Sequence, residues 1–248
     1  MRRRRSVSLM VGGGLVVAWS ALAPLASAAP PVTAGDPTRG RDLYATGCSS
    51  CHGPDAAGTD RGPSLLGVGA ASVDFWLSSG RMPYRGSGNE QAVRKPPAYN
   101  PQQIADLVAY LTAVDPSGPA VPELDVEGAD LVEGGELFRA NCAACHGAVA
   151  IGGALASGRR APPLRPATDR QIAEAIRTGP GQMPNFGPDT FTDEQVAAVV
   201  KYVRSLHQPD DKGGLGLGHA GPIPEGFVGW LAGLGLLLVA AWWIGERE

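Results

Sequence analysis

The amino-acid sequence predicts an all-α protein made of two tandem helical units and a C-terminal transmembrane helix. Three observations lead to this prediction. The pentapeptide CxxCH occurs twice and uses all four cysteines of the 248-residue chain. The segments around it recur in the same order in both halves. Near the C-terminus, residues 227–244 contain no charged side chain. The expected parts are a signal peptide at 1–28, a first unit at 29–117, a proline-rich linker at 118–126, a second unit at 127–208, a tether at 209–226 and a membrane helix at 227–244.

The first residues are typical of an export signal. Arg2–Arg5 precede an apolar stretch, Val7–Leu25, and the small residues Ala26–Ala28 form a cleavage pattern. An uncleaved anchor is the alternative, because about 19 apolar residues just suffice to cross a bilayer. The glycines within the stretch and the cleavage pattern favour removal. Removal of four of the 21 basic residues leaves 17 against 24 acidic ones, a net charge of −7, which argues against nucleic acid as a partner.

Each CxxCH motif is the attachment signature of a c-type haem. Its two cysteines are spaced to reach the two vinyl groups of one porphyrin, and the histidine that follows lies under the iron as the proximal ligand. The residues are Cys48, Cys51 and His52 in the first unit and Cys142, Cys145 and His146 in the second. A zinc site would draw its four ligands from two nearby pairs, but these pairs lie 94 residues apart. A thioredoxin-like dithiol would lie in a βαβ pattern, which the sequence lacks. We therefore expect two covalently bound haem c groups.

The methionines provide candidates for the second axial ligand. Met1 and Met10 belong to the signal, whereas Met82 and Met183 occupy matching Met-Pro positions in the two units, 34 and 41 residues after the first cysteine. A methionine is more often core filler. One methionine per haem at equivalent positions instead predicts axial ligation of each iron. Such His/Met coordination raises the reduction potential relative to His/His and leaves no open iron position. We therefore expect electron transfer and no catalytic residue.

The repeat includes a first and a last helix in each unit. A Gly-x-x-x-aromatic segment precedes the first cysteine by the same offset, as Gly40–Tyr44 and as Gly134–Phe138. Apolar residues recur at i, i+3, i+4 and i+7 in 104–111 and in 196–203, the pattern of an amphipathic helix. Pro101 and the Thr192-Asp193 pair provide starts for these helices.

This series resembles the small all-α cytochrome c fold, twice, over most of residues 36–208. The resemblance implies that the glycine of the first helix allows a close crossing with the last helix, where an aromatic side chain packs. The crossing residues are Gly40 and Tyr44 against Tyr110, and Gly134 and Phe138 against Tyr202. It also implies that Nδ1–H of each proximal histidine donates to a proline carbonyl. The acceptors are Pro63 for His52 and Pro162 for His146, with Pro163 as a competitor of Pro162.

The connecting segments are expected to be irregular. The linker is too rich in proline to form a helix and is stiffer than a Gly/Ser chain. An insertion at 84–100 carries Arg85, Arg94 and Lys95, and we interpret it as a solvated loop in preference to a docking surface. The remaining histidines, His207 and His219, lie near or in the tether and are interpreted as structural or solvated, with alternative iron ligation left open.

The uncharged segment at 227–244 is long enough to cross the hydrocarbon core as a helix. Trp242 and Trp243 lie where an aromatic belt is expected. Gly229 and Gly233 form a GxxxG spacing, which suggests packing against another membrane helix. A buried core helix is the alternative, but it would not normally be apolar on every face at the extreme C-terminus.

The order of parts resembles the dihaem cytochrome c subunit of the actinobacterial menaquinol:cytochrome c reductase, the cytochrome bcc complex. The motifs that carry this resemblance are Gly62–Phe75, Gly80–Pro83, Arg94-Lys95, Ala161–Leu164, Thr178–Pro180, Met183-Pro184, Gly216–Gly218, Gly221-Pro222 and the C-terminal helix. Trp76 departs from the pattern, since we expect glutamine there in relatives.

The resemblance implies an electron relay. Quinol is oxidised in a partner cytochrome b subunit, a Rieske iron–sulfur subunit takes one electron, and this chain passes it to a haem-copper terminal oxidase. The chain would then be the electron-transfer subunit of a quinol:cytochrome c oxidoreductase in the cell membrane, with its haem domains outside the cytoplasm and its C-terminus inside. Four alternatives remain: a dihaem subunit of a terminal oxidase or alcohol dehydrogenase, a dihaem peroxidase, a sulfur-compound dehydrogenase and a haem-loaded structural tether.

Overall fold

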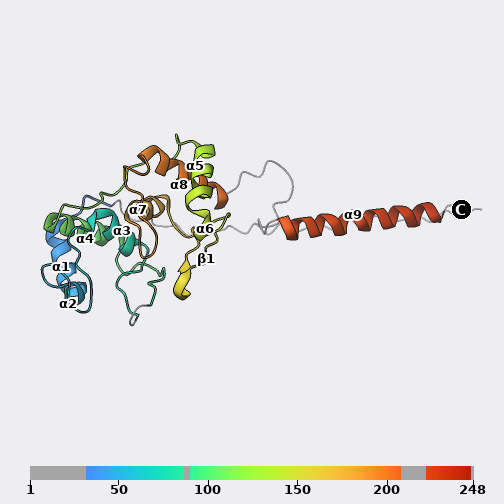
Figure 1. Ribbon diagram of the computed structural model, residues 1–248. Coiled ribbons are helices and arrows are strands. Elements are labelled where there is room, and N and C mark those ends of the chain that lie inside the picture. Colours follow the sequence, from blue (N-terminus) through green and yellow to red (C-terminus); the bar gives the residue numbers. More distant parts are fainter. Residues whose placement is uncertain (1–31, 87–89, 208–221, 247–248) are drawn as a thin grey trace, which may run out of the picture. The chain divides into compact units, whose positions relative to one another are not determined.

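The computed structural model describes residues 32–86, 90–207 and 222–246. The predicted signal peptide and most of the predicted tether lie outside these ranges. The described residues are mostly helical, as the sequence predicts, and Figure 1 labels the elements along the chain. Helices are separated by glycine- and proline-rich connections, and the linker region between residues 115 and 130 contains no helix, as expected.

Four helices lie in the described residues of the first half. They are α1 (Pro37–Gly47), α2 (Ser49–His52), α3 (Gly69–Ser78) and α4 (Pro101–Val114). Helix α1 begins after Asp36, whose carboxylate accepts hydrogen bonds from the first turn. Helix α4 begins with a capping box formed by Asn100 and Gln103, and Pro101 occupies the first turn, where its missing N–H costs nothing.

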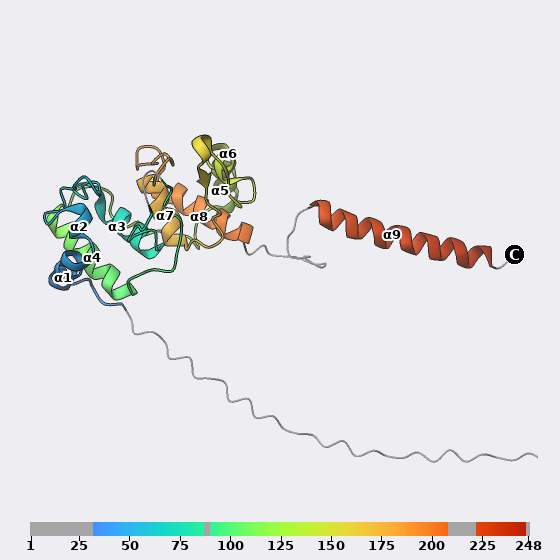
Figure 2. The ribbon, with the colours of Figure 1, turned by 90° about the horizontal axis from the view of Figure 1, so that it is seen from below.

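Helices α1 and α4 cross closely, side by side in Figures 1 and 2. A methyl group at Gly40 would overlap the carbonyl oxygen of Asp106, so the crossing requires glycine at this position. The ring centroids of Tyr44 and Tyr110 lie 5.3 Å apart across the same contact. The first of the two expected helix crossings is therefore confirmed.

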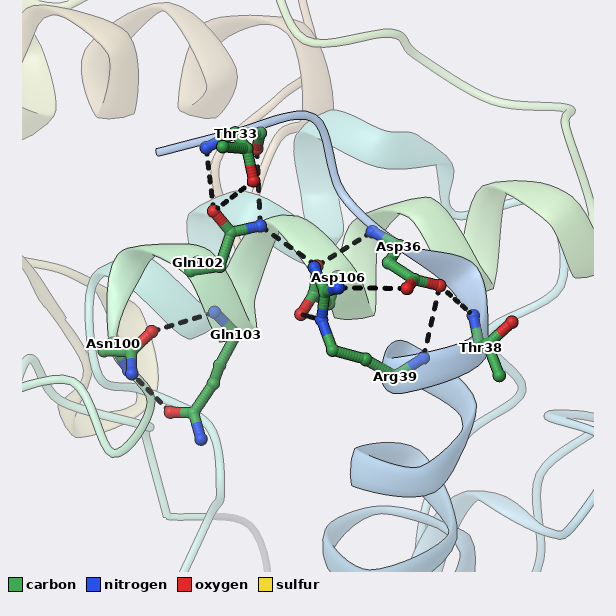
Figure 3. Close-up of polar contacts among 8 residues, drawn as sticks. All are labelled: Thr33, Asp36, Thr38, Arg39, Asn100, Gln102, Gln103 and Asp106. Atoms are coloured by element: carbon green, nitrogen blue, oxygen red, sulfur yellow. Dashed lines mark hydrogen bonds and ion pairs between the residues drawn. The ribbon is translucent and has the colours of Figure 1, made fainter. Parts of the chain in front are cut away.

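A polar network closes the outer end of this crossing (Figure 3). The buried carboxylate of Asp106 accepts from Arg39 Nε at 2.8 Å, from the N–H of Asp36 at 2.8 Å and from Gln102 Nε2 at 3.1 Å. Gln102 also accepts from the N–H of Thr33 at 2.7 Å, which ties the segment before α1 to α4. These hydrogen bonds hold the pKa of Asp106 at about 2. The carboxylate therefore stays charged, and it fixes the start of α1 through its hydrogen bonds with Asp36 and Arg39.

The second half repeats this plan with one addition. Its elements are α5 (Leu131–Asn141), α6 (Ala143–His146), β1 (Gly153–Ala154), η1 (Ala156–Gly158), β2 (Arg160–Ala161), α7 (Asp169–Thr178) and α8 (Asp193–His207). Gly134 of α5 lies against the backbone of α8, and the centroids of Phe138 and Tyr202 are 5.5 Å apart. The second crossing is confirmed too. The short antiparallel pair of β1 and β2, which periodicity did not predict, is the addition.

The described residues of the insertion at 84–100 are mostly exposed, as the interpretation as a solvated loop expects, but some of them also contact the second half. Gln91 forms two hydrogen bonds with the backbone of Arg160, at 2.8 and 3.0 Å. The half-buried Arg94 donates from Nη2 to Gln171 Oε1 at 2.7 Å. Gln171 Nε2 in turn donates to the hydroxyl of Ser78 on α3 at 3.0 Å. The insertion and α3 thus contact the second half through the buried Gln171 of α7.

Helix α9 (Pro222–Gly245) begins five residues before the predicted membrane segment. Proline is well tolerated in the first turn of a helix, since its missing N–H would have no partner there, and so Pro222 and Pro224 do not delay the start. The part from Glu225 to Gly245, 21 residues, is long and apolar enough to cross a membrane. Most of its described side chains, including those of Trp230 and Leu236, are exposed. This agrees with the predicted membrane anchor.

Candidate haem centres

Both CxxCH motifs fold into the same helical turn. In α2, the N–H groups of Cys51 and His52 donate to the carbonyl of Cys48, at 3.1 and 3.0 Å. In α6, the corresponding bonds to the Cys142 carbonyl measure 3.1 and 2.9 Å. Residues three apart in a helical turn lie on one side, so the two cysteines of each motif face the same way. This is the arrangement that attachment of one flat group through two thioethers requires.

A glycine ends each of these turns. Gly53 and Gly147 have φ values of 80° and 76°, a conformation that side chains disfavour. The chain reverses there, and a proline-containing segment returns to the histidine of the motif.

The histidines have one ring nitrogen fixed by that returning segment. His52 Nδ1 lies 2.8 Å from the Pro63 carbonyl oxygen, and His146 Nδ1 lies 3.0 Å from that of Pro162. A carbonyl only accepts, so Nδ1 carries the proton and Nε2 keeps its lone pair for a metal. Both expected hydrogen bonds are confirmed, and Pro162, not Pro163, is the acceptor. Burial lowers the pKa of His146, which favours the neutral imidazole that ligates metals.

In the first half, Met82 and Cys48 pack against one apolar cluster. Tyr44, Leu107 and Leu111 are among its buried members. The N–H of Met82 donates to the Trp76 carbonyl at 3.0 Å, which fixes the methionine at the end of α3. The structure therefore brings the candidate thioether donor and the first cysteine to the same apolar surface.

The candidate residues of the second half line a cavity of about 780 Å³, and first-half residues that include Phe75, Arg81 and Met82 line it too. Cys142, Cys145, His146 and Met183 all contribute to its wall. Cys142 and Met183 also pack against the apolar cluster formed by Phe138, Val199 and neighbouring side chains. Burial raises the pKa of the Cys142 thiol to about 11.

The residues present fit a haem. Ligand cavities typically have volumes of about 300–1,000 Å³ with mostly apolar walls and a few placed polar groups. The described residues include no disulfide between the four cysteines and no cluster of three or more His, Cys, Asp or Glu side chains that would hold a metal ion on its own. Two thiols on one face, an imidazole with free Nε2 and a thioether are instead the donor set of a c-type haem. His207 ends α8, and His219 lies outside the described residues.

Sequence reasoning missed two buried groups. Arg81 precedes Met82, and both line the cavity that contains the second-half candidates. Glu174 of α7 is fully buried beside Asp74 of α3. The sequence signal for Arg81 is its place within the repeated Gly-x-Met-Pro motif, where the second half has Gln182.

Comparison with known proteins supports the two-unit organisation. The family described as "Cytochrome c" matches residues 37–115, and the family described as "Cytochrome C oxidase, cbb3-type, subunit III" matches residues 129–203. Cytochrome c4 of Azotobacter vinelandii is 27% identical over 70% of this chain and 90% of its own length. Both halves are therefore cytochrome c domains, and such domains carry covalently bound haem c.

Two relatives extend over most of the chain. The "Cytochrome bc1 complex cytochrome c subunit" of Mycobacterium leprae is 42% identical over 97% of this chain and 86% of its own length. The protein of the same name in Corynebacterium diphtheriae is 38% identical over 84% of this chain and 80% of its own. The resemblance found in the sequence is thus confirmed. The chain belongs to the family of cytochrome c subunits of cytochrome bc1 complexes and is an electron-transfer subunit.

Proposed function

We propose that this protein carries two haem c groups, one in each half, and relays single electrons between them. The first haem is held by Cys48, Cys51, His52 and Met82, and the second by Cys142, Cys145, His146 and Met183. Bound haem c supplies a one-electron ferric/ferrous couple. The observation that carries the proposal is the matched geometry of the halves, in which each CxxCH turn has its histidine Nδ1 bonded to a proline carbonyl.

The chain's own residues would set the chemistry of the irons. The Pro63 and Pro162 carbonyls orient the imidazoles and make them better donors. Met82 and Met183 are soft, neutral ligands, which favour the reduced iron and keep small molecules from binding it. Apolar clusters pack against Met82 and Cys48 in the first half and against Met183 and Cys142 in the second, and they would shield one side of each haem from water. These features suit electron transfer better than a peroxidase or a dehydrogenase.

The proposed partners follow from the family. We infer that a Rieske iron–sulfur subunit, reduced by quinol oxidation in a cytochrome b subunit, donates electrons to this chain, and that a haem-copper terminal oxidase receives them. The chain is then the cytochrome c subunit of a quinol:cytochrome c reductase. Helix α9 anchors it in the cell membrane, with the haem domains on the extracytoplasmic side and the C-terminus in the cytoplasm.

Purification in mild detergent tests the partners. Cytochrome b and the Rieske protein are expected to co-purify with the tagged chain. Adding quinol to this preparation should reduce both haem c groups of the chain. An inhibitor of the quinol site should abolish the reduction, while ascorbate with a mediator should still reduce the haems. A preparation without cytochrome b and the Rieske protein would contradict the assignment.

The same preparation tests a second candidate, a dihaem subunit of a terminal oxidase. The match of residues 129–203 to the cbb3-type oxidase subunit favours this candidate for the second half. It predicts that an oxidase catalytic subunit co-purifies while the Rieske protein is missing.

A further inference from the structure

Arg81 is a buried cation without an acidic partner in the part of the chain that the structure describes. Only 9% of its surface is exposed, and its Nη1 atom has no hydrogen-bond partner there. Its guanidinium carbon lies 5.0 Å from the centroid of the Phe75 ring, a cation–π contact that gives Nη1 no hydrogen-bond acceptor. Buried charges are normally paired, so this arginine points to a missing anion.

Arg81 lines the cavity that contains Cys142, His146 and Met183, as does its neighbour Met82. A second cation, Arg94, lines the same cavity while it donates to Gln171. An arginine side chain keeps its charge at neutral pH, so both groups are cations there. Among the described residues, Glu90 is the one acidic side chain that lines the cavity, and it is exposed. The wall is therefore electropositive.

The turn around Arg81 is fixed by its neighbours. Gly80 has a φ of 65°, and a methyl group there would overlap the Lys95 carbonyl oxygen. The N–H of Lys95 donates to the Ser79 carbonyl at 3.3 Å, and the N–H of Met82 donates to that of Trp76 at 3.0 Å. Arg81 is thus held in place between two anchored residues, and its position does not depend on its own partner.

We propose that Arg81, a residue of the first half, binds a propionate carboxylate of the porphyrin attached at Cys142 and Cys145 in the second half. The inference rests on the haem sites of the proposed function. A planar guanidinium matches a carboxylate with two parallel hydrogen bonds, which a lysine ammonium cannot reproduce. Arg81 is then a positioning residue that couples the geometry of the halves to the potential of the second haem.

Potentiometric titration of the full chain in detergent tests this role. Arg81→Gln removes the charge, whereas Arg81→Lys keeps the charge but cannot form two parallel hydrogen bonds. The control is Arg41→Gln, which removes an exposed charge of α1 outside the cavity. Haem content is measured first in every variant. The two measured reduction potentials are assigned to the two haems with Met183→His, because this variant alters the axial ligand of the second haem alone.

Loss of a buried positive charge disfavours the reduced state of the nearby haem. In Arg81→Gln, we expect the reduction equilibrium of the second haem to shift about tenfold toward the oxidised form, or about 59 mV for a one-electron couple. Arg81→Lys should shift it less, and Arg41→Gln should leave both couples unchanged.

Three results would overturn the inference. The potentials could stay unchanged in a two-haem Arg81→Gln protein, the shift could be confined to the first haem, or Arg41→Gln could shift the second haem equally. A wild-type chain with fewer than two haems would instead contradict the proposed function, and this inference with it.

Discussion

A buried acidic pair between the halves should make stability depend on pH. Glu174 is fully buried, and within the described residues its Oε2 atom has no hydrogen-bond partner. Its Oε1 accepts from Arg170 Nε at 3.1 Å, and Arg170 also forms an ion pair with the buried Asp74 of α3. Burial and then the negative charge of Asp74 raise the pKa of Glu174 from its ordinary 4.5 to about 8, against the opposing charge of Arg170.

The direction in which the free energy of unfolding changes with pH follows from proton binding. Between pH 4.5 and about 8, the folded state keeps a proton on Glu174 that the unfolded state has released. The free energy of unfolding therefore falls as pH rises through this window, by about 1.4 kcal/mol per pH unit from this group. Its contribution is complete below pH 4.5, where both states are protonated, and is lost as pH rises through 8.

Glu174→Gln removes the titration but keeps the size of the side chain. The free energy of unfolding of the variant minus that of the wild type should increase by about 1.4 kcal/mol per pH unit between pH 5 and 7.5. Urea titrations of the full chain in detergent, followed by far-UV circular dichroism at several pH values, measure this difference. The control is Glu136→Gln, an exposed acid of α5. Parallel wild-type and Glu174→Gln curves would refute the reasoning.

Three further predictions concern the helix crossings and the anchor. Gly134→Ala should lower the free energy of unfolding by about 1–3 kcal/mol, because its methyl group overlaps a carbonyl oxygen of α8. The matched control is Gly187→Ala, whose methyl group meets open space. Equal urea midpoints of the two variants would contradict the crossing. Asp106→Asn should destabilise the chain at pH 7. Its free energy of unfolding should approach that of the wild type as pH falls from 3.8 toward 2, where the wild-type carboxylate protonates. A difference that stays constant with pH in the same urea titrations would contradict this prediction. Removal of residues 222–248 should move the chain from the detergent phase to the aqueous phase in a detergent partition assay, and retention in the detergent phase would argue against α9 as the anchor.

Local patterns predicted most of the architecture. The paired CxxCH motifs, the repeated Gly-x-x-x-aromatic segments and the apolar periodicity of 104–111 and 196–203 each depend on contacts within one half. A glycine at a helix crossing and an aromatic residue one turn later are short-range signals. The fold of each half and the candidate ligands followed from them.

Contacts between the halves were not predictable in this way. The sequence shows Arg94 and Gln91 in a polar, proline-rich stretch, which is typical of a solvated loop. Their partners, Gln171 and the backbone of Arg160, lie 77 and 69 residues away. The pairing of Asp74 with Glu174 likewise depends on how α3 meets α7, and no periodicity of either helix encodes it.

The central claim is that each half holds one iron between an imidazole nitrogen and a thioether sulfur. Peptide mass spectrometry combined with the near-infrared spectrum of the oxidised protein tests it most directly. We expect one haem on the peptide with Cys48 and Cys51 and one on that with Cys142 and Cys145, with a sulfur-to-iron charge-transfer band that is halved in either Met82→His or Met183→His. A peptide without haem, or a band that survives both substitutions unchanged, would contradict it.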